Sequence, residues 1–179
     1  MAHQFSQQYR DRIRSIHQRL GIDESYERDY KLWLQEEATD LLSVGNDVFH
    51  REQFLAPDVA KRWAVMRKAA QRDFVEISLV SCFRSVEQQT SIIQRKLDQG
   101  QNIREILKVS AAPGHSEHHT GRAIDIGTSG CEHLTEAFEE TMAFQWLSLH
   151  AERYGFTLSY PRNNTSGVSY EPWHWACSV

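Results

Sequence analysis

The amino-acid sequence predicts an α+β fold in which helices flank a small antiparallel sheet. Apolar residues recur at helical spacing over the first third of the chain, and short segments with strand-like alternation follow from residue 74 onward. No repeat, low-complexity tract or long linker divides the 179 residues. We therefore expect one domain, 1–179, with an N-terminal helical part at 1–56 and a core at 57–179.

Three helices are expected before the first strand. In the first, at about 5–20, apolar residues recur every three or four positions, and Gly21 follows as a stop signal. The second covers about 31–49, where leucines and an alanine form the apolar stripe. The third opens at Pro57, which fits the first turn of a helix, and places Trp63 and later apolar residues on one face.

Strands and helices alternate in the rest of the chain. The segment "FVEISLVS" (74–81) has the period of a strand, and Ser85 with Gln88 forms a capping box for the helix after it. Pro and Gly make "AAPGHSEHHTG" a loop. The remaining expected elements are helices at about 86–98, 102–109 and 132–152, and strands at 122–127, 155–160 and 170–178.

The composition argues against several functional classes. A formal net charge of −4 and a pI near 6.1, without a Lys/Arg-rich block, argue against nucleic-acid binding. No apolar run approaches the ~18 residues of a membrane span. The first twenty residues lack the apolar region of a secretory signal, so we expect a cytoplasmic protein, or a periplasmic or exported one if a leader has been removed. The sequence indicates no oligomeric state.

The stretch "GHSEHHTGRAIDIG" (114–127) joins a histidine-rich loop to a strand. Strand alternation places Asp125 on one face and the neighbouring isoleucines on the other, so the carboxylate would face a cleft on the sheet. Together with His174 and one loop histidine, it would form a catalytic zinc shell with one open position. The spacing does not choose among His115, His118 and His119.

Two further charged residues are candidates for catalysis. Glu171 lies three residues before His174, and strict strand alternation would turn the two side chains to opposite faces. Pro172 favours an irregular start to the strand, which would let Glu171 serve as a general base. Arg84 lies at a strand-to-helix corner, where its donors could meet an oxyanion, although its position alone fits a solvated arginine equally well.

Three motifs, in order, resemble those of the LAS metallopeptidases, which include VanY-type D-alanyl-D-alanine carboxypeptidases and LD-carboxypeptidases of peptidoglycan. "SEHHTGRAID" is similar to their Ser-x-His-x-x-Gly-x-Ala-x-Asp signature. "SCFRSVEQQ" is similar to their Ser-Gly-Tyr-Arg-Ser-x-x-x-Gln segment, and "EPWHW" to their Glu-Pro-Trp-His segment. The likeness covers roughly 60–177, and the first fifty residues carry no such motif.

The resemblance implies that 57–179 is a metallopeptidase core, and it assigns roles by position. The zinc ligands would be His118, Asp125 and His174, the catalytic base Glu171, the transition-state arginine Arg84, and the substrate-pocket residues Ser116 and Gln89. Arg122, beside the metal loop, is a third candidate for binding the substrate carboxylate. Cys82-Phe83 replaces the usual Gly-Tyr and Ala176 a frequent arginine, so the departures concern substrate choice rather than metal ligands.

The resemblance implies a zinc carboxypeptidase whose partner is a peptidoglycan stem peptide. An LD-carboxypeptidase that trims tetrapeptides in murein recycling fits the expected cytoplasmic location, because cutting D-Ala-D-Ala there would damage cell-wall precursors. The alternatives are a DD-carboxypeptidase, a peptidoglycan endopeptidase and a zinc-containing binding module without activity. Because Glu171 and Arg84 are both present, the sequence favours an enzyme over the binding module.

Overall fold

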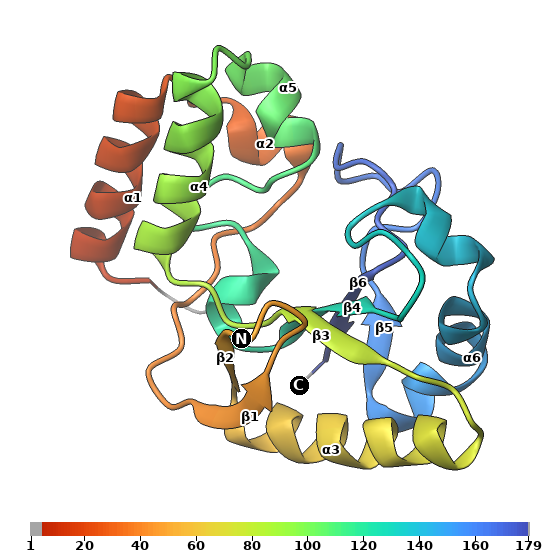
Figure 1. The fold of residues 1–179 in the computed structure, drawn as a ribbon. Coiled ribbons are helices and arrows are strands. Elements are labelled where there is room, and N and C mark those ends of the chain that lie inside the picture. Colours follow the sequence, from red (N-terminus) through yellow and green to blue (C-terminus); the bar gives the residue numbers. More distant parts are fainter. Residues whose placement is uncertain (1–4, 179) are drawn as a thin grey trace.

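The computed structural model of the protein describes residues 5–178 and confirms the α+β class (Figure 1). Three short 3-10 turns, Glu117–Thr120, Glu136–Glu140 and Ala151–Tyr154, complete the regular structure. No helix within the described residues has the length and apolar character that crossing a membrane requires. In chain order the helices and strands are α1 (Gln7–Leu20), α2 (Tyr26–Tyr30), β1 (Leu42–Asn46), β2 (Glu52–Leu55), α3 (Pro57–Arg72), β3 (Ser78–Ser81), α4 (Val86–Asp98), α5 (Ile103–Lys108), β4 (Ala123–Gly127), α6 (Met142–His150), β5 (Phe156–Leu158) and β6 (His174–Cys177).

The main sheet has four strands in the order β3-β4-β6-β5, and every neighbouring pair is antiparallel, as predicted. On one face of the central strand β4, Ile124 and Ile126 pack with Trp63 of α3 in an apolar core. The opposite face carries Ala123 and Asp125, in keeping with strand alternation. The alternation of β4 thus separates a packed face from a face that is available for chemistry.

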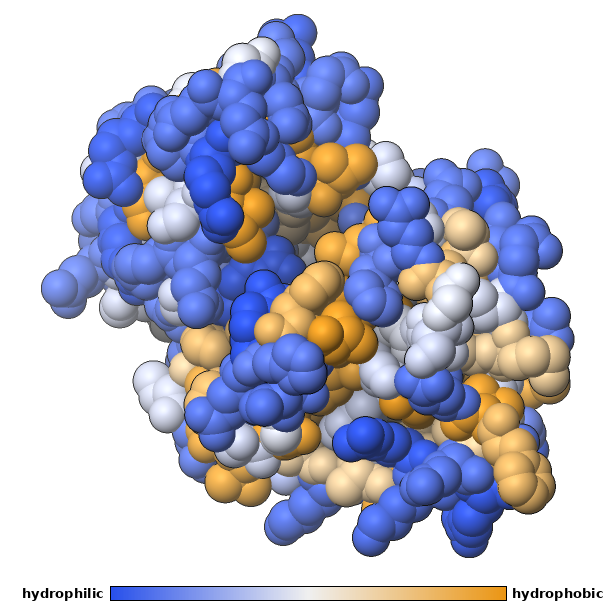
Figure 2. All heavy atoms as spheres, in the orientation of Figure 1, coloured by the Kyte–Doolittle hydropathy of each residue, from blue (hydrophilic) through white to orange (hydrophobic). Residues whose placement is uncertain are grey.

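A second apolar core holds the helices α1, α4 and α5 together. Ile13 and Ile16 of α1 meet Ile93 of α4 and Ile106 of α5, and all four are buried. This helical part lies on the side of the sheet away from α3 (Figure 1). Hydrophilic residues cover most of its visible surface, whereas apolar residues gather toward the centre of that view (Figure 2).

Two glycines fix the path of the loop that runs from the helical part into β4. Gly114 and Gly121 have φ angles of +86° and +65°, a region that side chains with a Cβ rarely adopt. A Cβ on Gly114 would meet Ile13 at 2.8 Å, and one on Gly121 would meet Leu41 at 2.8 Å. Both ends of the loop therefore lie in close contact with the N-terminal part of the chain.

The predicted helix at 31–49 is wrong, because this segment uses its backbone donors elsewhere. The N–H groups of Gln35 and Ala38 donate to the carbonyls of Gly114 and His119, at 2.7 and 2.8 Å. The segment then enters the antiparallel hairpin β1-β2. The N-terminal part, 1–56, is consequently helical only in part: it contains α1, α2 and this hairpin.

Several other elements are shorter than predicted, and two of them differ most from the expectation. The helix expected at 132–152 is divided at Thr141, whose extended ψ of 154° starts a new helix and whose side chain caps it. The strand expected from residue 74 begins only at Ser78. Phe74 has a φ of 58°, and the N–H of Val75 still bonds the Ala70 carbonyl, so this stretch belongs to the end of α3.

A buried histidine in the loop before β4, packed against His17 and Tyr26, makes stability depend on pH. Burial, followed by the nearby His17, lowers the pKa of His115 from 6.5 to about 4. The unfolded chain therefore takes up this proton at a higher pH than the folded chain does. The stabilisation is complete above about pH 6.5 and is lost as the pH falls from there toward 4.

We predict that lowering the pH from 7 to 5 reduces the free energy of unfolding of the wild type by about 2 kcal/mol more than that of His115→Gln. Urea unfolding in the presence of a chelator measures the difference. His150→Gln, at the end of α6, is the matched control and should retain the wild-type dependence. The same pH dependence in the wild type and His115→Gln would contradict the prediction.

Candidate metal centre

Three buried side chains from distant parts of the chain meet on the free face of the sheet. Asp125 lies in the middle of β4, and His174, the first residue of β6, is its direct partner in the antiparallel register. Side chains of directly paired residues project to the same face. His118 reaches them from the 3-10 turn before β4. One donor atom from each of the three lies within 4.8 Å of the others.

The aspartate lies between the two imidazoles. His118 Nε2 is 3.3 Å from Asp125 Oδ2, and His174 Nδ1 is 3.0 Å from Asp125 Oδ1. Burial opposes ionisation of Asp125, but the two histidines outweigh it and hold its pKa below the usual range. Burial also opposes protonation of His174, but its bonds to Asp125 and Glu117 raise its pKa to about 10. A cation that binds here must therefore displace a proton from His174.

The donor set fits zinc. Zinc prefers imidazole nitrogen and carboxylate oxygen, and catalytic sites use three such protein ligands. His118 Nδ1 lies 2.6 Å from the Cys82 carbonyl, so it carries the proton and leaves Nε2 as the free donor atom. His174 Nε2 lies 2.8 Å from Glu117 Oε2, and this contact directs His174 Nδ1 to the centre. This arrangement of an outer acceptor behind each ligating histidine is typical of zinc sites.

Glu117 is the residue of this centre that the sequence analysis missed. It occupies the variable position between Ser116 and His118, and the motif gives it no role. Its partner His174 is far away in the sequence, so only the return of β6 beside the 3-10 turn brings the two together. One signal in the sequence could have pointed to Glu117: it is a carboxylate beside a candidate metal ligand. Histidines that bind a metal usually hydrogen-bond a carboxylate or carbonyl through their other ring nitrogen.

Glu171 lies beside the ligands although simple strand alternation would turn it away. Strand β6 begins only at His174, whose N–H donates to the Glu171 carbonyl at 3.1 Å. This turn brings Glu171 Oε2 to 3.9 Å from His174 Nδ1. Burial, with repulsion from Asp125, raises the pKa of Glu171 to about 7 against the opposing effects of His174 and Arg84. A carboxyl group with this pKa suits proton transfer near neutral pH.

Arg84 faces the same centre from the corner between β3 and α4. Its Nη2 is 3.7 Å from Asp125 Oδ2 and donates to Ser81 Oγ at 3.2 Å. Its Nη1 donates to Gln89 Oε1 at 2.7 Å, and Gln89 in turn donates to the Ala111 carbonyl at 2.6 Å. Gln89, predicted to line the substrate pocket, is fully buried and holds Arg84 in place.

Ser116 and Arg122, the other predicted substrate residues, have different surroundings. Ser116 is buried and directly precedes the turn that carries Glu117 and His118. Arg122 precedes β4 on the side of Ile124, and its guanidinium bonds the Asp58 carboxylate at 2.8 and 3.0 Å. It also donates to the Cys177 carbonyl. The structure thus separates Arg122 from the metal centre, because Asp125 projects from the opposite face of the strand.

The two other loop histidines have partners of their own. His115 Nδ1 lies 3.1 Å from the Leu32 carbonyl, and His119 Nδ1 lies 2.6 Å from the Arg84 carbonyl. Burial lowers the pKa of both to about 4, so each is a neutral hydrogen-bonding group. They connect the metal loop to its surroundings and do not join the ligand group.

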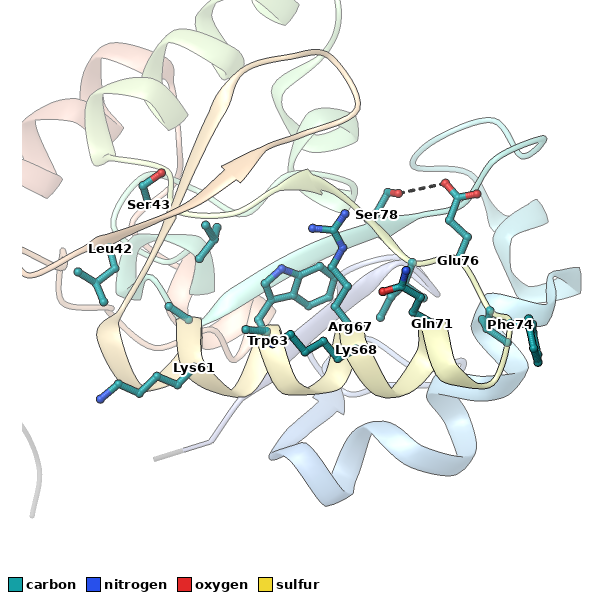
Figure 3. A pocket seen from close by; sticks show the side chains of 15 residues that line it. Leu42, Ser43, Lys61, Trp63, Arg67, Lys68, Gln71, Phe74, Glu76 and Ser78 are labelled. Atoms are coloured by element: carbon teal, nitrogen blue, oxygen red, sulfur yellow. Dashed lines mark hydrogen bonds between the residues drawn. The ribbon is translucent and has the colours of Figure 1, made fainter.

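A large hollow elsewhere on the molecule does not coincide with this centre. It has a volume of about 860 Å³ and lies between β1, α3 and the segment before β3 (Figure 3). Trp63 and Arg67 of α3 line it on one side and Glu76 on another. None of the predicted site residues lines it. The chemistry-bearing side chains, rather than the size of the hollow, locate the candidate site.

The contact between Glu117 and His174 predicts an effect on metal affinity. Glu117→Ala should weaken zinc binding about 10- to 100-fold, because His174 loses the acceptor that orients its ring. Glu117→Gln, which keeps an acceptor oxygen without the charge, should lose less. Chelator competition measures both, and Glu140→Ala, at an exposed glutamate, is the control. Wild-type affinity in Glu117→Ala would rule out this role.

Comparison with known proteins places this centre in a family. The family model "VanY: D-alanyl-D-alanine carboxypeptidase" matches residues 52–177, which include every residue of the centre. Putative carboxypeptidase YodJ of Bacillus subtilis (strain 168) is 34% identical over 128 residues, covering 69% of this chain and 46% of YodJ. The chain therefore spans less than half the length of this curated relative.

Solved structures agree with the sequence match. The LdcB LD-carboxypeptidase superposes with a TM-score of 0.71 at 31% identity, over 80% of this chain and 70% of that one. A variant of the vancomycin-resistance D,D-pentapeptidase VanY, in complex with Zn(II), gives a TM-score of 0.59 at 26% identity, over 84% and 80% of the two chains. With the family model spanning most of its length, the chain belongs to the VanY family.

Proposed function

We propose that the protein is a zinc-dependent carboxypeptidase that removes the terminal D-alanine from peptidoglycan stem peptides, with a preference for the LD bond of tetrapeptides. The observation that carries this proposal is the buried group of His118, Asp125 and His174, with Glu171 beside it. When bound, zinc acidifies a water molecule and polarises the carbonyl of the scissile bond. The VanY variant structure that contains Zn(II) supports the choice of metal.

The side chains around the centre have distinct roles in this reaction. Glu171 accepts a proton from the attacking water and returns it to the leaving amine, a task that suits a buried carboxyl whose Oε2 lies 3.9 Å from His174 Nδ1. Arg84, held by Gln89 and Ser81, directs its donors toward the oxygen that becomes negative as the carbonyl is attacked. Both groups are in place before substrate arrives, which reduces the cost of reorganisation.

The LD preference and the recycling role have separate support. LdcB, at 31% identity, is an LD-carboxypeptidase. We further propose a cytoplasmic location, where trimming of recycled tetrapeptides leaves the pentapeptide precursors of the wall intact. The second candidate is a DD-carboxypeptidase, which the family description and the D,D-pentapeptidase VanY favour. A binding module without activity is disfavoured because Glu171 and Arg84 both lie at the centre.

Peptide hydrolysis tests the reaction and its specificity together. The zinc-loaded protein, incubated with muramyl tetrapeptide and with muramyl pentapeptide, should release D-alanine faster from the tetrapeptide. Mass spectrometry of the products measures the release, and the chelator-treated protein is the control. Release from the pentapeptide alone would establish the DD alternative, whereas internal cleavage of the stem would establish the endopeptidase.

Replacement of the proposed base tests the mechanism. Glu171→Gln should lower kcat about 10²- to 10⁴-fold, because the amide cannot accept the proton of the attacking water. Zinc content should stay unchanged, since no ligand is removed. Glu152→Gln, on the exposed surface, is the control for a general effect of this substitution. Wild-type turnover in Glu171→Gln would remove this residue from the mechanism.

A further inference from the structure

The large hollow between α3, β1 and the segment before β3 contains a buried donor that the folded chain does not use. Its volume of about 860 Å³ lies within the range of ligand sites, roughly 300–1,000 Å³. Trp63 lines it and is only 2% exposed. Within residues 5–178 its indole N–H donates to no acceptor, and the nitrogen is not sealed from solvent. A buried indole N–H usually has an acceptor, so a ligand oxygen in the hollow could supply the missing one.

Arg67 adds a guanidinium to the same hollow. It follows Trp63 by one helical turn, and residues four apart lie on one face of a helix. Both side chains point from α3 toward the strands (Figure 3). Among the described residues, no carboxylate lies within ion-pair distance of Arg67. An indole donor and an unpaired guanidinium on neighbouring turns are suited to bind one carboxylate.

The lining of the hollow carries an excess of positive charge, although the whole chain has a net charge of −4. Lys61 and Lys68 also line it, and in the part of the chain that the structure describes neither has a carboxylate within ion-pair distance. Glu76 is the one acidic residue among those that line the hollow, and it accepts hydrogen bonds from Ser78 and Ser129. The local charge therefore favours an anionic ligand.

A free strand edge borders the hollow as well. Strand β3 lies at one edge of the main sheet, where the N–H of Val48 donates to the Leu79 carbonyl at 2.9 Å. Ile77 lines the hollow two residues earlier, and its own N–H and C=O make no hydrogen bond within residues 5–178. Unpaired backbone groups at the edge of a sheet can pair with an extended peptide.

We propose that this hollow is a docking site for an extended, acidic peptide segment of a partner protein. The backbone of the segment pairs with Ile77, and one of its carboxylates binds Arg67 and the Trp63 indole. Its apolar side chains pack on Leu42 and Phe74, which line the hollow and are 46% and 98% exposed. A small anion would use the donors alone, whereas an acidic peptide also uses the strand edge and the apolar side chains. The site is separate from the metal centre, none of whose residues lines the hollow.

The first test follows the tryptophan indole signals of the isotope-labelled, zinc-loaded protein by NMR. The probe is a capped heptapeptide in which glutamate and valine alternate. It should shift the Trp63 signal, which Trp63→Phe identifies among the five tryptophans. Arg67→Gln should weaken binding about tenfold or more, because a charged hydrogen bond is lost. Arg72→Gln, on the same helix but outside the hollow, is the control and should bind like the wild type.

The second test examines the strand edge with N-methylated versions of the same peptide. N-methylation of the valines removes the donors of one peptide edge, and N-methylation of the glutamates removes those of the other. One of these two peptides should bind about tenfold more weakly than the unmodified peptide, because its hydrogen bonds to Ile77 are lost. Equal affinities for all three peptides would contradict docking by strand addition.

The remaining outcomes separate this partner from other occupants. An unchanged Trp63 signal at every peptide concentration would overturn the proposal. So would an equal shift with glutarate at the concentration that saturates the peptide, because the site would then bind small anions. Dimerisation of the protein that Arg67→Gln abolishes would assign the hollow to a second copy of this chain and exclude the peptide partner.

Discussion

The burial of Asp125 between two imidazoles is the interaction on which the rest of the site depends. A carboxylate removed from water needs compensating charge or hydrogen bonds. His118 and His174 supply both, at 3.3 and 3.0 Å, and Glu117 and the Cys82 carbonyl hold these histidines from behind. Glu117 and the Cys82 carbonyl therefore determine which ring nitrogen of each histidine faces Asp125. This orientation prepares the three side chains to bind a divalent cation in place of a proton.

The fold keeps this charged group in a fixed geometry by dividing its supports between two apolar cores. The sheet core, packed on α3, holds Asp125 and His174 in direct register. The helical core positions α4 and the loop that carries His118, and Gly114 seats this loop against α1. Gln35 and Ala38, in a segment without regular structure, donate their N–H groups to carbonyls of the same loop, so this segment contributes to the position of a candidate metal ligand.

The role that each charged side chain around the centre can take depends on the contacts that it already makes. Glu171 has few favourable contacts and a pKa of about 7, so it remains able to exchange a proton. Arg84 is tied to Ser81 and Gln89, which suits a fixed donor rather than a mobile one. Arg122 is not available to bind a substrate carboxylate, because Asp58 already binds its guanidinium.

Local patterns were enough to predict the capping box at Ser85, the alternation around Asp125 and, with the motifs, the three residues that meet in the candidate metal group. These features depend on residues close together in the chain or on a spacing that the fold preserves. Contacts between distant segments were needed for the rest. The helical spacing at 31–49 was overridden because its donors bond the metal loop, and Glu117 acquired its partner only when β6 returned beside β4. The partner of Arg122 was likewise decided by tertiary packing, because α3 brings Asp58 to its guanidinium, a contact that the sequence alone does not reveal.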